Sequence, residues 1–230
     1  MTSKSSRSRR PAGPARPRGP RWRRRKDARP EEILRAALEV FVTRGFAAAR
    51  LDEVARRAGV SKGTIYLYFP GKEALFKAVV RQNIVPNIER AEHMVATHEG
   101  RAGDALRAIV RGLWEAVGES SLSGIPKLII AEAANFPDLA RFYYTEVASR
   151  GIGLLMRIIE RGITRGEFRP VDPRYAAMAV LGSGLFAVIW KHSLYPIAGT
   201  AFDFRAFIEV HLENCIRGLS RNTDQDGSHA

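Results

Sequence analysis

The chain has 230 residues and a formal net charge of +13. Its 45% hydrophobic content excludes wholesale disorder, and its length is enough for one large domain or two small ones. A single cysteine, Cys215, excludes an internal disulfide framework and a multi-cysteine zinc site, so we expect a reducing, cytoplasmic setting. The longest mostly apolar stretch, 176–190, is short and interrupted by Gly and Ser, so we expect no membrane partner.

The positive charge is concentrated at the N-terminus. Residues 1–29 carry +11 of the net charge, together with four prolines and one large apolar residue, Trp22. Such a segment cannot bury enough apolar surface to offset its ordering entropy, so we expect a disordered basic arm. An arm of this kind suits a polyanion, and Arg23, Arg24 and Arg25 are near enough to the folded region to reach DNA. A merely solubilising tail is the alternative interpretation.

Three short helices are expected directly after the arm. Pro30 is suited to a first helical turn, and apolar residues then recur at helical spacing until Gly45. A second helix is expected over 51–58 and a third over 61–69, joined by a Gly59-containing turn with Ser61 as N-cap. Two short helices joined by such a turn are typical of a helix-turn-helix, whose second helix can enter the major groove of DNA.

The residues of this region closely resemble the DNA-binding domain of TetR-family transcriptional regulators. The resemblance rests on Gly45-Phe46, on the run LDEVARRAGVSKGTIYLYF over 51–69, and on KEAL over 72–75. It covers about residues 31–77. In one departure, Ala49 and Arg50 stand where the family usually places a Thr or Ser that caps the second helix and contacts phosphate. Any phosphate contact there must therefore come from the Arg50 side chain or from backbone N–H groups.

The resemblance implies roles in DNA binding, and the chemistry of the side chains fits them. Lys62 can donate to guanine O6 or N7, and Gly63 lets the backbone approach DNA closely. The phenols of Tyr66 and Tyr68 suit phosphate or thymine-methyl contacts, although packing in the core is the alternative for either ring. Lys72 matches a family lysine that clamps the DNA backbone, the alternative being an ordinary surface lysine. The expected DNA-binding residues are Arg50, Ser61, Lys62, Gly63, Thr64, Tyr66, Tyr68, Lys72, Arg23, Arg24 and Arg25.

The remainder of the chain shows helical periodicity and no alternating segment, so we predict an all-α fold. A helix from Lys72 should kink or break at Pro86, one long helix is expected over 138–165, one from Pro173 to about residue 194, and a last one over 203–221. The expected domains are the disordered arm (1–29), a three-helix DNA-binding domain (30–76), a larger helical ligand-binding and dimerisation domain (77–221) and a flexible tail (222–230).

The family resemblance implies that the last two helices pair with those of a second copy, forming a homodimer that places two recognition helices in successive major grooves. We expect the apolar stripe containing Leu212 and Ile216 to form that seam. The function we predict is a repressor released from a palindromic operator on double-stranded DNA by an unknown, largely apolar small-molecule effector. Candidate pocket residues are Trp114, Phe142, Tyr143, Met156, Phe186 and Trp190.

Other features of the sequence bear on two alternative function classes, an enzyme and a non-specific DNA binder. The run from Gly182 to Ala187 fits the G-x-G-x-x-A spacing of dinucleotide-binding enzymes, but that motif requires a preceding strand and this segment favours helix. The five histidines form no metal-ligand pattern, so we expect no enzyme activity, no cofactor and no metal. The other class, a non-specific DNA binder relying on the arm, is disfavoured by the well-formed helix-turn-helix.

Overall fold

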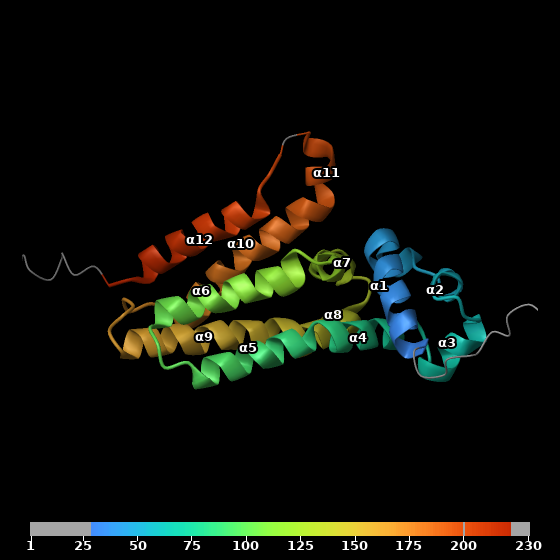
Figure 1. Cartoon of the computed structure of the whole chain (residues 1–230), viewed down its shortest axis with the longest axis horizontal. Helices are drawn as coiled ribbons and strands as arrows, with labels where there is room; N and C mark the ends of the chain where they lie inside the picture. Colours follow the sequence, from blue (N-terminus) through green and yellow to red (C-terminus); the bar gives the residue numbers. More distant parts are fainter. Residues whose placement is uncertain (1–28, 200, 222–230) are drawn as a thin grey trace, which may run out of the picture.

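The computed structural model describes residues 29–199 and 201–221, and no strand occurs within these ranges. One isolated bridge joins Phe168 and Ser220. The predicted all-α fold is confirmed, with α1–α3 at one end of the molecule and the other helices extending from it (Figure 1). The elements are α1 (Arg29–Ala48), α2 (Leu51–Arg57), α3 (Lys62–Tyr68), α4 (Lys72–Asn83), α5 (Val85–Thr97), α6 (Ala102–Leu113), η1 (Trp114–Gly118), η2 (Ser121–Ser123), α7 (Gly124–Glu132), α8 (Pro137–Tyr143), η3 (Tyr144–Ala148), α9 (Ser149–Thr164), α10 (Pro173–Ser193), α11 (Tyr195–Ala198) and α12 (Phe204–Leu219).

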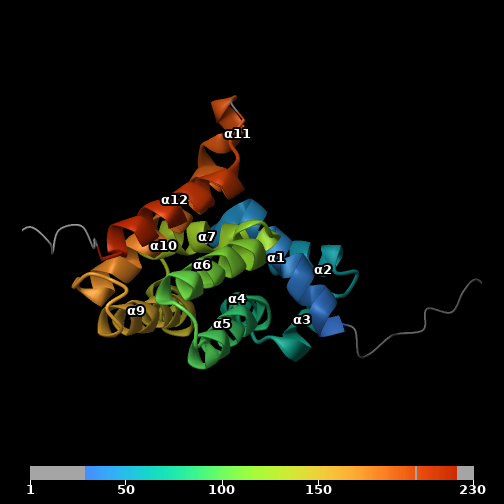
Figure 2. The ribbon, with the colours of Figure 1, turned by 60° about the vertical axis from the view of Figure 1, so that its left-hand side comes forward.

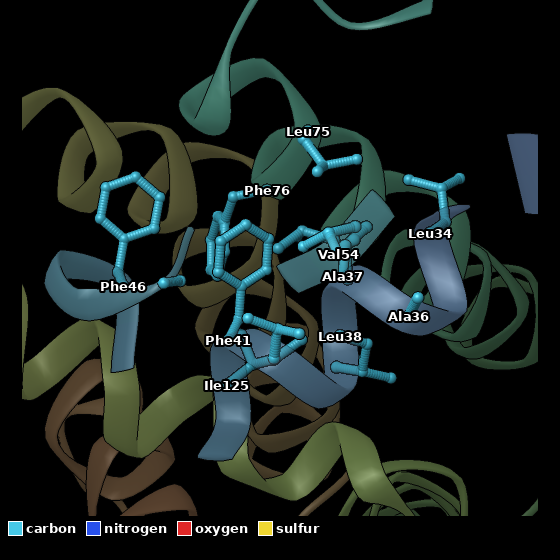
Figure 3. Packing of buried hydrophobic residues seen from close by; sticks show 14 of the residues in the cluster. Leu34, Ala36, Ala37, Leu38, Phe41, Phe46, Val54, Leu75, Phe76 and Ile125 are labelled. Carbon is cyan, nitrogen blue, oxygen red and sulfur yellow. The ribbon is translucent and has the colours of Figure 1, made fainter. Parts of the chain in front are cut away.

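Helix α1 is held at its C-terminal end by a cluster of aromatic rings. Gly45 has φ 77° and ψ 167°, so the regular helix ends where the sequence predicted and a short segment turns away. This turn sets Phe46 against Phe41 and Phe76, with ring centroids 5.7 Å from each, and against Phe136 at 4.8 Å. Figure 3 shows Phe41 and Phe46 of α1 together with Phe76 of α4.

The hydrophobic core around α1 extends beyond the DNA-binding helices into α7 and α8. Ile125 and Leu128 of α7 and Leu139 of α8 are buried in the same cluster as Phe41 and Phe46. The expected domain boundary at residue 76 falls inside α4, which packs against α1 as well as α5 and α8. The first three helices therefore share one continuous core with α7 and α8.

A second core cluster lies among α6, α9, α10 and α12, and includes Leu106, Leu154, Val180 and Ile208. The single helix expected over 138–165 is divided into α8, a π-helical segment (η3) and α9. A π turn adds a residue to the helical register without interrupting the rod, which periodicity over a long window cannot resolve. The break at Pro86 is confirmed, because α4 ends at Asn83 and α5 carries this proline in its first turn.

Helices α10 and α12 lie on one outer side of the molecule, away from α4 and α5 (Figures 1 and 2). The outward residues of α10 form an apolar stripe in which Tyr175 is 70%, Met178 49% and Phe186 53% exposed. Of the described residues, α10 alone is long and apolar enough to cross a bilayer by length and composition. It is not a membrane span, because it packs along α9, α7 and α12 within a helical domain.

The prediction that Leu212 lies on an exposed dimer seam is wrong. Leu212 is 1% exposed and belongs to the chain's own core, and Ile216 packs against the same cluster, facing Gly103 of α6. The periodic stripe of α12 correctly indicated an apolar face. Periodicity could not indicate whether that face meets its own chain or a second copy, and here it meets its own chain.

Candidate nucleic-acid interface

The helix-turn-helix is fixed by its turn. Gly59 has φ 64°, a left-handed conformation that permits a sharp reversal after α2, and the Val60 N–H donates to the Ala55 carbonyl at 3.0 Å. The Ser61 Oγ accepts the Thr64 N–H at 3.1 Å, which confirms Ser61 as the N-cap of α3. The start of α3 is thereby oriented by backbone geometry rather than by long side chains.

The recognition helix α3 attaches to the domain through one residue. Ile65 is fully buried, whereas Tyr66 is 50%, Leu67 83% and Tyr68 42% exposed. The exposure of both phenols rules out full burial in the core, and Ser61, Lys62 and Gly63 are exposed as well. Leu67 was not among the predicted site residues. The sequence did contain a signal for it. Leu67 lies on the opposite face of the helix from the buried Ile65, so its apolar side chain must lie in solvent or against a partner.

Asp52 links two of the predicted DNA-binding cations. Its carboxylate lies 3.0 Å from the Lys62 Nζ and 3.7 Å from an Arg50 guanidinium nitrogen. All three side chains are about half exposed or more, so the attraction is weak in water and exchangeable for phosphate. Arg50 precedes α2 without making a side-chain cap, as the departure from the family pattern implied.

Glu53 braces α2 against the end of α1. Its carboxylate is 3.0 Å from Arg57 and 3.5 Å from Arg44, and the Arg57 hydrogen bond holds the pKa of Glu53 below its ordinary value. Arg57 also reaches Glu39 of α1 at 3.4 Å. These pairs link the first two helices, and they engage Arg57 with two carboxylates, so that Arg57 is not free for DNA.

Lys72 is not an ordinary surface lysine. Its ammonium donates to the Ala47 carbonyl at 2.9 Å and lies 4.7 Å from the centroid of the Phe46 ring. Burial lowers the pKa of Lys72, while the nearby carboxylates of Glu132 and Glu73 oppose that shift. The side chain thus ties α4 to the end of α1, and a contact with DNA would have to share or replace this bond.

The other predicted residues are not gathered in one place. Arg23, Arg24 and Arg25 lie outside the described residues, as does nearly all of the predicted arm. Trp114 and Met156 belong to the C-terminal core cluster, but Phe142 and Tyr143 pack against the cluster around α1. Phe186 lies on the outer face of α10, with Trp190 beside it at a centroid distance of 6.0 Å. The six pocket candidates therefore do not line a single cavity.

The features that suggested enzyme chemistry have structural explanations. The run from Gly182 to Ala187 lies in the middle of α10 with helix on both sides, so it has no strand-to-helix turn to hold a pyrophosphate. His, Cys, Asp and Glu side chains form no cluster of three that could hold a metal within the described residues. Cys215 is half-buried beside His211, and burial raises the pKa of its thiol.

Comparison with known proteins identifies both parts of the chain. The family model described as "Bacterial regulatory proteins, tetR family" matches residues 33–79, and the model described as "AefR-like transcriptional repressor, C-terminal domain" matches residues 104–194. The chain is a TetR-family transcriptional regulator. Members of this family are ligand-responsive DNA-binding transcriptional repressors and not enzymes.

Full-length relatives agree with the assignment of this TetR-family regulator. The HTH-type regulator YfiR of Bacillus subtilis is 26% identical over 197 residues, which cover 82% of this chain and 94% of the relative. The fatty acid metabolism regulator protein of B. subtilis is 27% identical over 162 residues, covering 69% and 81%. A crystal structure of B. subtilis FadR in complex with stearoyl-CoA shares the fold, with a TM-score of 0.63, 22% identity and coverage of 82% of this chain and 98% of that one.

Proposed function

We propose that this regulator binds a palindromic operator as a homodimer and is released from it by a largely apolar small molecule. The observation that carries the DNA-binding half is α3 itself. Its first turn is oriented by the Ser61 cap, and Lys62, Tyr66 and Leu67 are exposed around one buried anchor, Ile65. Lys62 supplies a donor for guanine, and Leu67 supplies an apolar contact for a thymine methyl group.

The outward stripe of α10 supports the homodimer. Exposed residues recur at helical spacing over about three turns, from Tyr175 to Phe186, and Val210 on α12 is a further exposed apolar residue at 59%. Gly182 and Ala179 lie within the stripe and allow two helices to approach closely. Exposed apolar side chains that line up along one helix are typical of an interface.

The apolar effector is supported by the aromatic side chains where α10, α11 and α12 meet η1. Trp114, 7% exposed, stacks on Phe204, while Phe202 bridges Phe204 and Phe207. The indole N–H groups of Trp114 and Trp190 are buried without an acceptor among the described residues. A ligand with an apolar body and one or two acceptor oxygens would satisfy them. The relative FadR, crystallised with stearoyl-CoA, is consistent with an apolar effector class.

The deciding experiment is selection of duplexes from a random pool by the full chain, followed by titration of the selected site and a scrambled duplex at moderate salt. A two-fold symmetric site with a specificity ratio of about a thousand or more supports the proposal, and equal affinity for both duplexes refutes it. Lys62→Ala should alter the preferred bases. Tyr66→Ala should weaken all sites and lower the salt slope by about one per lost phosphate contact. Tyr144→Ala, an exposed tyrosine in η3, is the matched control.

A further inference from the structure

A pocket of about 280 Å³ lies at the junction of the DNA-binding helices and the C-terminal domain. One wall is the end of α1, from Phe41 to Gly45, and the other is α7, from Gly124 to Glu132. His192, near the end of α10, completes the lining. The two walls touch closely beside the pocket, since a Cβ on Gly124 would lie 2.5 Å from the Val42 side chain. An occupant would therefore contact both domains.

The lining contains more positive than negative charge. Arg44 and Lys127 are among the lining residues, and Glu132 is the only lining carboxylate. Lys127 makes no ion pair or hydrogen bond with any described residue, and Arg44, whose side chain is 59% exposed, makes one ion pair, a 3.5 Å contact with Glu53. Two cations from different helices are therefore available to one ligand.

The negative charge of Glu132 is already engaged. Its Oε1 accepts the Ala47 N–H at 3.0 Å, and its carboxylate interacts with the ammonium of Lys72, which itself donates to the Ala47 carbonyl. The Glu132 carboxylate thus interacts with Ala47 at the end of α1 and with Lys72 of α4, and it makes no ion pair with Lys127. The remaining lining is a cationic site bounded by apolar side chains of Phe41, Val42 and Leu128.

His192 is held in a defined orientation at this site. The fully buried Ser123 donates its hydroxyl to the Ser120 carbonyl at 2.7 Å, so its oxygen accepts from the His192 Nε2–H at 2.8 Å. This arrangement leaves Nδ1 as the nitrogen that gains a proton on acidification. Burial lowers the pKa of His192, and the ammonium groups of Lys191 and Lys127 lower it further. Lys191 is engaged with the Gly118 carbonyl at 2.8 Å.

We propose that this junction pocket binds a small organic anion, with Lys127 and Arg44 as its charge partners and His192 as a third donor when protonated. The volume of about 280 Å³ is just below the usual range of ligand pockets, which suits a small ligand such as a di- or tricarboxylate or a small phosphate ester. The anion bridges α1 and α7 and stabilises the junction between the two domains. It favours the charged imidazole, so its binding is tighter at acidic pH. The site is separate from the aromatic cluster proposed for the apolar effector.

The test uses the full chain without DNA, so its outcome is independent of the proposed operator binding. Citrate, malonate and inorganic phosphate are titrated against sodium chloride at matched ionic strength. The His192 ring is followed by NMR, with its signal assigned by loss in His192→Gln, and the thermal midpoint is recorded in parallel. We expect at least one anion to raise the His192 pKa and the midpoint at millimolar concentration.

Variants distinguish binding of the anion at this pocket from a general effect of ions on the protein. Lys127→Gln should weaken the anion-induced shift at least tenfold, and Arg44→Gln should weaken it as well. Arg174→Gln, which removes the same charge at the exposed start of α10, should leave it unchanged. The proposal is overturned if no anion moves the His192 signal, or if Lys127→Gln and Arg174→Gln respond alike.

Discussion

Replacing Phe186 by alanine tests whether the outer face of α10 joins two copies of the regulator. The ring is 53% exposed in the single chain, which is about 100 Å² of the roughly 200 Å² of an aromatic side chain. At about 25 cal/mol per Å² its burial contributes about 2.5 kcal/mol per subunit. In a two-fold symmetric interface the substitution acts twice, and alanine keeps its Cβ, so we expect a loss of about 4 kcal/mol per dimer. The dissociation constant of the dimer should therefore rise about a thousandfold in Phe186→Ala.

Sedimentation velocity over a dilution series measures this change directly. The parent should remain dimeric at concentrations where Phe186→Ala is monomeric, and helicity should be retained because the ring lies on the outer face. Tyr144→Ala is the control, since Tyr144 is 58% exposed but lies on η3, away from the stripe. The reasoning fails if Phe186→Ala and Tyr144→Ala dissociate at the same concentration as the parent.

Three further predictions concern the core, an ion pair and the arm. Phe46→Ala removes a fully buried ring and should lower the free energy of unfolding by about 3–5 kcal/mol in chemical denaturation, whereas a loss under 1 kcal/mol would contradict the packing described. The Arg150 hydrogen bonds hold the pKa of Glu92 below its ordinary value. The ion pair therefore stabilises the fold at pH values above the ordinary pKa of a glutamate, and this stabilisation is lost as the pH falls through the lowered pKa. Arg150→Gln should therefore cost about 1 kcal/mol at pH 7 and little near pH 3, and an equal cost at both would refute the assignment. Deleting residues 1–28 should preserve operator preference while lowering affinity and salt slope, and unchanged binding at low salt would show that the arm is only a tail.

The local features of the DNA-binding helices could be predicted because they depend on short-range chemistry. Gly59 and Ser61 determine their turn and cap through backbone conformation and one hydrogen bond, and both act within four residues along the chain. The contacts of Lys72 within the fold could not be predicted in the same way. Its bond to Ala47 and its contact with Phe46 depend on how α4 meets the end of α1, a tertiary arrangement.

The sequence predicted that the C-terminal half is helical, but it did not predict which apolar helix faces are buried within the chain and which are exposed. The stripe of α12 and the stripe of α10 are both apolar at helical spacing, yet Leu212 is buried in the chain and Phe186 is half exposed. Neither residue type nor spacing distinguishes them. The junction pocket was also beyond prediction, because Arg44, Lys127 and His192 are distant in sequence and meet only through the packing of α1, α7 and α10.

The continuous core that joins α1 and α4 to α7 and α8 has a consequence for engineering. A chimaera that grafts residues 30–76 onto another regulator would leave Phe46 without Phe136 and would strip Phe41 of the α7 side chains beside it. The exposed rings would favour aggregation of the graft. Exchange of DNA specificity is therefore safer by substitution on the surface of α3 than by transplanting the domain, and a transplant that succeeds should carry the facing residues of α7 and α8 with it.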